Sequence, residues 1–239
     1  MLKQSLYYNL YQMKYSLIIP IYNEIKTLKK LIKKLELLPK NIEKIIVDDG
    51  SDDGSEVLLK DYNKLKLVKN KKNYGKGYSI RQGLNIASYE NIILIDGDLE
   101  IDIENIPNLI SEYEIAPQNI LIGTRWPSIN DKRIKNADDF GNYIINKFFN
   151  FVYKTNFNDV LCCLKILKKK DISGLCLSSN GFSIESEIMA KLVTKNYSTK
   201  EVSIKYERRT VKQGKKLKMI HGWNILFTII SVKLTNQFH

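Results

Sequence analysis

The sequence predicts an α/β fold in which a mainly parallel sheet is flanked by helices. From residue 15 to residue 123, short β-branched runs alternate with segments that carry apolar residues at helical spacing, which is the pattern of strand, helix, strand units. The chain of 239 residues is long enough to bury a core that needs no disulfide or metal support. Because we find no interdomain linker and no internal repeat, we expect a single domain over residues 1–239.

Each element of the first half follows from its local pattern. An uninterrupted apolar run predicts a buried strand, and the helical spacing of Ile25, Leu28 and Leu31 predicts a helix that Pro39 ends. The predicted elements are, in order, a strand at 15–21, a helix at 24–38, a strand at 44–48, a turn at 49–55, a strand at 65–68, a helix at 77–87, and strands at 92–95 and 120–123.

The last third of the chain is less regular. Its predicted elements are a helix with aromatic residues from 140 to 151, a short strand around 161–167, a helix at 185–195, a strand at 202–206, a basic loop and a final apolar helix at 223–234. The aromatic helix and the final helix either pack into the core or place one apolar side on a membrane surface. The final helix is far shorter than the roughly 20 apolar residues that a membrane span needs.

Charge and rare residues limit the classes of function. Lys and Arg total 38 against 26 Asp and Glu, a net charge of +12, but five of the basic residues are arginines and the rest lysines, which disfavours specific nucleic-acid recognition. The three cysteines form no Cys-x-x-Cys pair, so we expect a reduced, cytoplasmic environment. Residues 1–13 lack the apolar stretch of a signal peptide, and we expect neither secretion nor a transmembrane helix. The two histidines, His221 and His239, leave catalysis to carboxylates, cations and hydroxyls.

Chemically active residues directly follow the predicted strands. The clusters are Pro20 to Glu24, Asp48 with Asp49, Asn73 to Gly77, Asp96 with Asp98, and Arg125. Because ligands of parallel sheets bind at the carboxyl ends of the strands, these clusters predict one binding site.

The strongest local feature is Asp96-Gly97-Asp98, at the end of an apolar strand. Two carboxylates at this spacing on a turn can converge on Mg²⁺ or Mn²⁺, which take oxygen ligands and keep positions for a diphosphate. Glu100 extends the acidic run, so the candidate metal ligands are Asp96, Asp98 and Glu100. The alternative is a turn capped by aspartates ahead of a helix at Pro107.

Two other turns carry polar residues of similar interest. The segment from Asp48 to Ser55 offers a carboxylate to ribose hydroxyls or a base N–H, although Asp53 or Ser55 can instead cap the next helix. The segment from Asn73 to Tyr78 matches neither the dinucleotide fingerprint nor the P-loop. A helix that starts there can still direct N–H groups and Lys76 at a phosphate.

A cationic loop precedes the final helix. Its basic residues are Arg208, Arg209, Lys212, Lys215 and Lys216. The loop is either a solvated basic segment or, beside a diphosphate site, a source of charge that neutralises the leaving group.

Five motifs occur in a fixed order along the chain. They are Ser16 to Glu24, Val47 to Ser55, Asn73 to Gly77, Asp96 to Glu100, and Gly123 to Arg125. In this order they resemble the family-2 glycosyltransferases of GT-A fold, and within them the chain is most similar to the dolichyl-phosphate mannosyltransferase, or polyprenyl-phosphate sugar transferase, group. The resemblance covers about residues 15–217 and implies a Rossmann-like sheet. Residues 15–125 would then bind a nucleotide sugar, and the irregular region 126–239 would form the acceptor side and end in an amphipathic helix.

The resemblance also implies the reaction and the residues that serve it. The reaction is inverting transfer of a sugar from a GDP- or UDP-linked donor, with Mg²⁺ or Mn²⁺ as cofactor. Pro20, Tyr22, Glu24, Val47 and Asp49 would hold base and ribose. The other donor-binding candidates are Lys76, Asp96, Gly97, Asp98, Arg125, Arg209, Lys215 and Lys216, and the catalytic candidates are Asp98, Arg125 and Asp159.

Three segments depart from the pattern of this group. The group has Asp-Ala-Asp-Leu-Gln where this chain has Gly97 and Glu100, so that a carboxylate replaces an amide. The late Arg-x-x-Gly-x-Ser-Lys element appears as residues 209–216 without its serine, which leaves open whether Lys215 or Lys216 contacts the donor. The segment 159–165 also differs, on the acceptor side.

The expected acceptor is a polyprenyl phosphate at the cytoplasmic face of the membrane, with the protein peripheral on that inner face. A phosphate is already ionised at neutral pH and needs no general base. The alternative is a sugar hydroxyl in cell-surface polysaccharide or glycolipid synthesis, with Asp159 or Asp138 as the base. More remote alternatives are a non-catalytic nucleotide-sugar-binding protein and a nucleic-acid-binding protein. We expect no nucleic-acid partner, because the acidic strand ends would repel a phosphate backbone.

Overall fold

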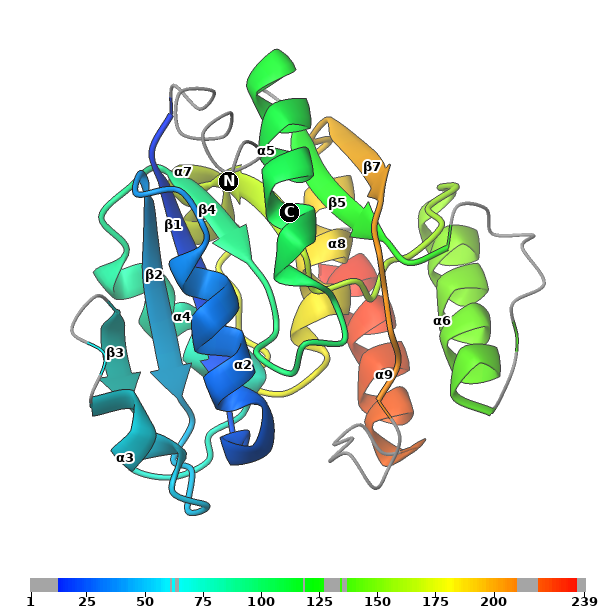
Figure 1. Cartoon of the computed structure of the whole chain (residues 1–239). Helices are drawn as coiled ribbons and strands as arrows, with labels where there is room; N and C mark the ends of the chain where they lie inside the picture. Colours follow the sequence, from blue (N-terminus) through cyan, green and yellow to red (C-terminus); the bar gives the residue numbers. More distant parts are fainter. Residues whose placement is uncertain are drawn as a thin grey trace.

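A seven-stranded sheet forms the centre of the computed structural model, which describes residues 13–60, 62, 65–117, 119–126, 134, 137–209 and 219–235 (Figure 1). The strands are β1 (Tyr15–Ile21), β2 (Ile42–Asp48), β3 (Lys66–Lys69), β4 (Asn91–Leu94), β5 (Ile120–Thr124), β6 (Lys165–Lys168) and β7 (Thr199–Ser203), in the spatial order β3-β2-β1-β4-β6-β5-β7. The first four strands pair in parallel, as do β5 and β7. Strand β6 is antiparallel to both of its neighbours.

Helices cover both faces of the sheet. They are α2 (Ile25–Glu36), α3 (Ser55–Lys60), α4 (Lys76–Ile86), the 3₁₀ turn η1 (Ile103–Asn105), α5 (Ile106–Ile115), α6 (Ala137–Tyr153), α7 (Lys169–Gly174), α8 (Ile184–Thr194) and α9 (Met219–Thr235). Successive residues of β1 point to opposite faces, so Leu17 and Ile19 pack with α2 and α5, whereas Ile18 packs with α4. The second face is completed by α6, α8 and α9.

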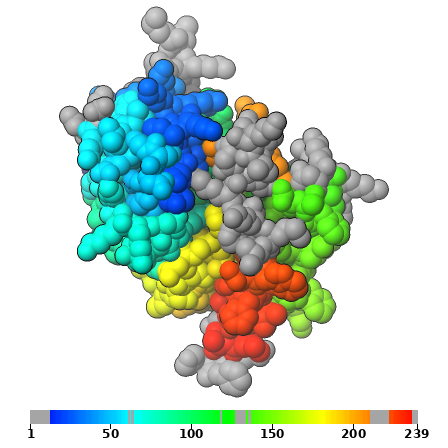
Figure 2. Space-filling model, turned by 90° about the horizontal axis from the view of Figure 1, so that it is seen from below, coloured from blue at the N-terminus to red at the C-terminus, as the bar shows by residue number. Residues whose placement is uncertain are grey.

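The C-terminal helix α9 packs against both α6 and α8, and Figure 2 shows it at the surface beside α6. One side of α9 is buried through Ile225, Ile229 and Val232. A second apolar side is exposed: Trp223 is 75% and Phe227 73% exposed. In the described part of the chain, every helix is too short or too polar to span a lipid bilayer.

The structure confirms the predicted α/β order but shifts several elements of the last third. The strand expected at 202–206 is β7 at Thr199–Ser203, and beyond it Tyr206 makes a single bridge to Ile101. The strand expected at 161–167 is β6 at Lys165–Lys168. The apolar residues just before it, at 162–164, are buried in the core but do not belong to the strand. The short helix α7 was not expected.

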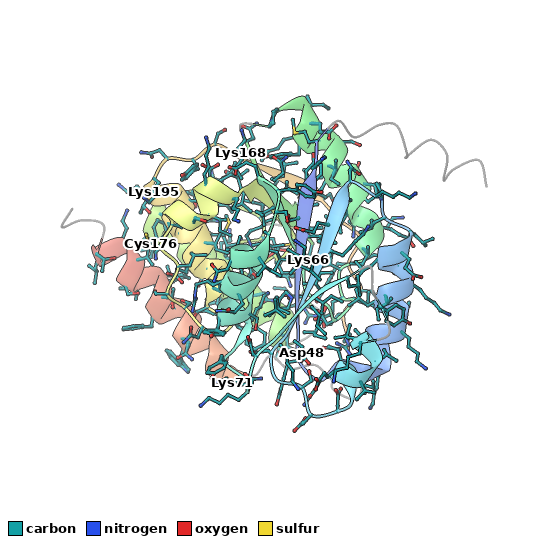
Figure 3. The ribbon with its side chains drawn as sticks, turned by 90° about the vertical axis from the view of Figure 1, so that its left-hand side faces the viewer. Asp48, Lys66, Lys71, Lys168, Cys176 and Lys195 are labelled. Atoms are coloured by element: carbon teal, nitrogen blue, oxygen red, sulfur yellow. The ribbon has the colours of Figure 1, made fainter. Side chains whose placement is uncertain are left out.

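The lysine excess covers the outer surface. Lys66, Lys71, Lys168 and Lys195 are spread over one side of the molecule rather than gathered at one point (Figure 3). Other surface lysines form ion pairs with nearby carboxylates, such as Lys69 with Glu56 and Lys200 with Glu112. This arrangement supports the interpretation of most lysines as solvated surface residues.

Candidate active site

A pocket of about 950 Å³ opens at the carboxyl ends of β1, β2 and β4. The predicted residues that line it are Pro20, Tyr22, Glu24, Asp49, Lys76, Asp96, Gly97, Asp98, Glu100, Arg125 and Arg209. Among the described lining residues, seven are carboxylates (Glu24, Asp49, Asp96, Asp98, Glu100, Asp138 and Glu185) and four are cations (Lys76, Arg125, Arg208 and Arg209). Lys215 and Lys216 lie outside the described residues.

Asp49 organises the loop that leads into α4. Its Oδ1 accepts hydrogen bonds from the Tyr74 N–H at 3.0 Å and the Asn70 side chain at 2.7 Å, and its Oδ2 accepts from the Gly75 N–H at 2.7 Å. Gly75 has φ of +99°, a conformation that favours glycine. The expected neighbour Val47 is fully buried and does not line the pocket, because its side chain packs in the core with residues of α4.

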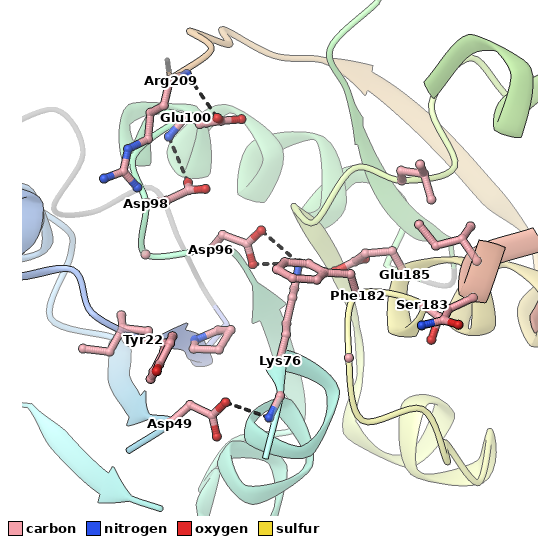
Figure 4. A pocket seen from close by; sticks show the side chains of 18 of the residues that line it. Tyr22, Asp49, Lys76, Asp96, Asp98, Glu100, Phe182, Ser183, Glu185 and Arg209 are labelled. Carbon is pink, nitrogen blue, oxygen red and sulfur yellow. Dashed lines mark hydrogen bonds and ion pairs between the residues drawn. The ribbon is translucent and has the colours of Figure 1, made fainter. Parts of the chain in front are cut away.

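A chain of ion pairs runs from Asp96 through Lys76 and Glu185 to Lys165; Figure 4 shows its first three members. The Lys76 ammonium lies 2.8 Å from Asp96 Oδ1 and 2.8 Å from Glu185 Oε1, and Lys165 pairs with the other oxygen of Glu185. Burial alone would lower the pKa of Lys76, but the charges of Asp96 and Glu185 hold it well above its usual value. Burial alone would raise the pKa of Glu185, whereas Lys165 and Lys76 lower it. Lys76 and Glu185 therefore both stay charged at neutral pH.

Asp98 and Glu100 form the second acidic group. Asp98 Oδ1 accepts a hydrogen bond from the Glu100 N–H at 3.0 Å. Burial, together with the charges of Asp96 and Glu100, raises the pKa of Asp98 to about 7. A cation bound beside Asp98 and Glu100 would relieve this crowding of like charge.

The three predicted metal ligands do not converge in this structure. Among the residues that the structure describes, no group of three His, Cys, Asp or Glu side chains is placed to hold a metal ion, because Asp96 faces Lys76. Asp98 and Glu100 remain as a pair. That pair fits Mg²⁺ or Mn²⁺, since such ions are often held by one or two carboxylates together with substrate phosphates.

Each arginine of the pocket is matched with a carboxylate. Asp159 accepts from Arg125 through both oxygens, with its Oδ1 2.7 Å from Nη2 and its Oδ2 2.7 Å from Nε. Arg209 Nη1 donates to both oxygens of Glu24 at 2.9 and 3.1 Å. Arg208 pairs with Asp139 on α6.

The arrangement of Asp159 differs from the role expected of a general base. Its side chain is 1% exposed and lies behind Arg125, outside the lining of the pocket. Asp159 therefore orients Arg125. Of the two predicted bases, Asp138 lines the pocket, with its side chain 45% exposed and 3.8 Å from Arg208.

Some lining residues could not be found from local sequence patterns. They include Asn142 on α6, Phe182, Ser183 and Glu185 at the start of α8, and Tyr206 after β7. From its local sequence, Glu185 is only an acidic residue in the first turn of a helix, which is a common position for such residues. Burial of Tyr206 raises the pKa of its hydroxyl to about 12, so this group is a hydrogen-bond donor at neutral pH.

The family follows from comparison with known proteins. A family model described as glycosyl transferase family 2 matches residues 16–175, which is more than half of the chain. The chain belongs to glycosyl transferase family 2. The polar strand ends described above all lie within the matched segment.

The chain matches curated relatives over different shares of their length. An uncharacterized protein of Methanocaldococcus jannaschii is 29% identical over 81% of this chain and 89% of its own. The dodecaprenyl-phosphate galacturonate synthase of Rhizobium johnstonii is 28% identical over 64% of this chain, which spans about half (47%) of that protein. The undecaprenyl-phosphate 4-deoxy-4-formamido-L-arabinose transferase of Aeromonas hydrophila is 25% identical over 92% of this chain and 68% of its own.

Solved structures confirm the fold of this family-2 glycosyltransferase. Mannosyl-3-phosphoglycerate synthase from Rubrobacter xylanophilus superposes with a TM-score of 0.70 at 14% identity, over 93% of this chain and 73% of that one. Glucosyl-3-phosphoglycerate synthase from Mycobacterium tuberculosis, solved with uridine diphosphate, gives 0.69 at 14% identity, over 94% and 80%. The fold is therefore GT-A, as the motifs indicated.

Proposed function

We propose that this glycosyltransferase transfers a sugar, with inversion, from a nucleotide-diphosphate sugar to a polyprenyl phosphate, with Mg²⁺ or Mn²⁺ as cofactor. The observation that carries the proposal is the pairing, in one pocket, of the acidic group Asp98 and Glu100 with the arginines Arg125, Arg208 and Arg209. A diphosphate needs a hard cation, and a phosphate acceptor needs arginine. The Rhizobium and Aeromonas relatives are named for dodecaprenyl phosphate and undecaprenyl phosphate, which supports an acceptor of this class.

On the donor side, Pro20, Tyr22 and Asp49 line the part of the pocket assigned to base and ribose. Asp98 and Glu100 would hold the metal ion, which, when bound, neutralises charge on the departing nucleoside diphosphate. Lys76 and Asp96 form a fixed ion pair beside this group. Because both residues of this ion pair line the pocket, we assign the pair to positioning the donor.

The acceptor step needs no proton transfer. A phosphate oxygen is already ionised, so it can attack the anomeric carbon in line while Arg125 holds the charge of the acceptor or of the leaving group. The bidentate contact with Asp159 fixes the guanidinium of Arg125 before substrate arrives. A general base is therefore not required.

The route of the lipid is suggested by α9. Phe227 is 73% exposed and also lines the pocket, and it lies on the exposed apolar side of the helix with Trp223, Ile230 and Leu234. An apolar side that continues into the mouth of the pocket suits contact with a membrane surface.

A transfer assay tests the proposed function. The full chain, incubated with undecaprenyl phosphate and a panel of UDP- and GDP-sugars, is expected to form a lipid-linked sugar with one donor, and EDTA is expected to lower the rate at least ~100-fold. The anomeric configuration of the product, measured by NMR, should be inverted. Product formed with a free sugar acceptor and none with the lipid phosphate would instead favour hydroxyl transfer with Asp138 as base.

Replacing Trp223 and Phe227 together with serine is expected to weaken binding to vesicles of phosphatidylcholine and phosphatidylglycerol by roughly tenfold or more. The double variant lacks the two large apolar side chains that would move from water into the membrane surface on binding. Co-sedimentation measures the bound fraction. The control is Ile115→Ser, which removes an apolar side chain that is 78% exposed on α5. Equal binding by both variants and the unmodified protein would show that α9 does not dock.

A further inference from the structure

The segment from Tyr206 to Arg209 is fastened to the acidic turn that contains Glu100. Tyr206 forms a bridge with Ile101, and the Glu207 N–H donates to the Glu100 carbonyl at 2.8 Å. Two more contacts involve the Glu100 side chain. Its Oε1 accepts from the Arg209 N–H at 3.1 Å, and its Oε2 accepts from the Tyr206 hydroxyl at 3.1 Å. Each carboxylate oxygen therefore has one described donor.

The direction of the Tyr206 hydrogen bond is fixed by its second partner. Arg208 Nε, which can only donate, lies 3.0 Å from the Tyr206 hydroxyl. The hydroxyl oxygen accepts there, so its single proton goes to Glu100. Two guanidinium groups lie near the ring itself, with the carbon of Arg125 at 5.3 Å and that of Arg208 at 5.9 Å from its centroid.

We propose that Tyr206 is a positioning residue for the metal ion: its hydroxyl, with the Arg209 N–H, orients the Glu100 carboxylate for the cation. The inference rests on the metal-dependent function proposed above. A carboxylate oxygen has two lone pairs, so each oxygen of Glu100 keeps one for a cation after accepting its hydrogen bond. Hydrogen bonds of this kind to a ligating group typically change metal affinity 10- to 100-fold when they are removed.

The position of Tyr206 also connects the arginines of the pocket with its acidic pair. The hydroxyl contacts Glu100 on one side and Arg208 on the other, and the ring contacts Arg125. A shift of Glu100 toward a bound cation would therefore be passed to the groups assigned to the phosphates. The local sequence offers no sign of this, because Glu100 and Tyr206 are 106 positions apart.

The test measures Mn²⁺ affinity directly, by electron paramagnetic resonance of free Mn²⁺ titrated with the full chain, with and without UDP. Tyr206→Phe keeps the ring and removes the hydroxyl, and we expect affinity to fall roughly tenfold. The matched control is Tyr113→Phe, which removes a buried hydroxyl that contacts Asn91 at the amino end of β4, the end opposite the pocket; it should bind Mn²⁺ like the unmodified protein. Thermal melting of each variant confirms folding.

A double-mutant cycle separates action through Glu100 from a general effect. Glu100→Gln alone should lose Mn²⁺ affinity, and adding Tyr206→Phe to it should cause no further loss. Unchanged Mn²⁺ affinity in Tyr206→Phe, or an equal loss in the Glu100→Gln background, would overturn the inference while the metal site stands. Failure of the unmodified protein to bind Mn²⁺, with or without UDP, would overturn the metal dependence proposed above and this inference with it.

Discussion

Replacing Asp98 with asparagine is expected to lower kcat/KM for sugar transfer by roughly 10²- to 10⁴-fold, because a metal ion contributes several kcal/mol to stabilising the departing charge. Asp98 is the carboxylate of the acidic group whose pKa is raised by burial and by like charge, and asparagine keeps its shape without its charge. The control is Asp102→Asn, four residues along the chain, where the carboxylate pairs with Lys34 at the surface. Its rate should stay within about twofold. Full metal-dependent turnover by Asp98→Asn would remove Asp98 from the metal site.

The same substitution should not destabilise the metal-free protein. The folded state raises the pKa of Asp98 from 3.8 to about 7, so in this window the folded state binds the proton more tightly than the unfolded chain. The ionised carboxylate therefore lowers the free energy of unfolding progressively from about pH 4, fully above about pH 7. Asp98→Asn should melt at a higher temperature than the unmodified protein at pH 8 in EDTA and at a similar temperature near pH 4. Loss of activity with gain of stability would mark Asp98 as functional.

Replacing Lys165 with methionine is expected to lower the free energy of unfolding by about 3–5 kcal/mol, because it leaves the charge of Glu185 in the core with one partner fewer. Lys165 is 0% exposed and is anchored to Glu185 and to the carbonyl of Cys162. For a chain of this length the melting temperature should fall by roughly 6–20 °C. Differential scanning calorimetry measures it.

Two companion variants show whether that loss comes from the buried charge. Lys200→Met removes an ammonium that pairs with Glu112 while 47% exposed, and it should change the free energy of unfolding by less than about 1 kcal/mol. The double variant Lys165→Met with Glu185→Gln should recover part of the lost stability, since no unpaired charge remains. Equal effects of Lys165→Met and Lys200→Met would contradict the buried chain of charges.

Strand and helix positions up to β5 were predictable because apolar spacing and Pro39 are local signals. The location of the pocket was predictable too, since the carboxyl ends of parallel strands meet at one edge. The partners of the site residues were not. Glu185, on α8, forms an ion pair with Lys76, and Asp159 binds Arg125 although the two are 34 positions apart in the sequence. Tertiary packing alone brings such pairs together. For this reason Asp96 faces Lys76 rather than the other two predicted metal ligands, and Asp159 lies behind Arg125 rather than in the lining of the pocket.

The described lining of the pocket carries seven carboxylates and four cations, a local balance opposite in sign to the net charge of +12 of the whole chain. A metal-free nucleoside diphosphate, which is multiply negative, would meet like charge beside Asp98 and Glu100. A nucleotide sugar that carries a divalent cation presents little net charge and would avoid this repulsion. Charge at this end of the pocket would therefore favour the metal-complexed donor over the free nucleotide and leave the acceptor phosphate to the arginines.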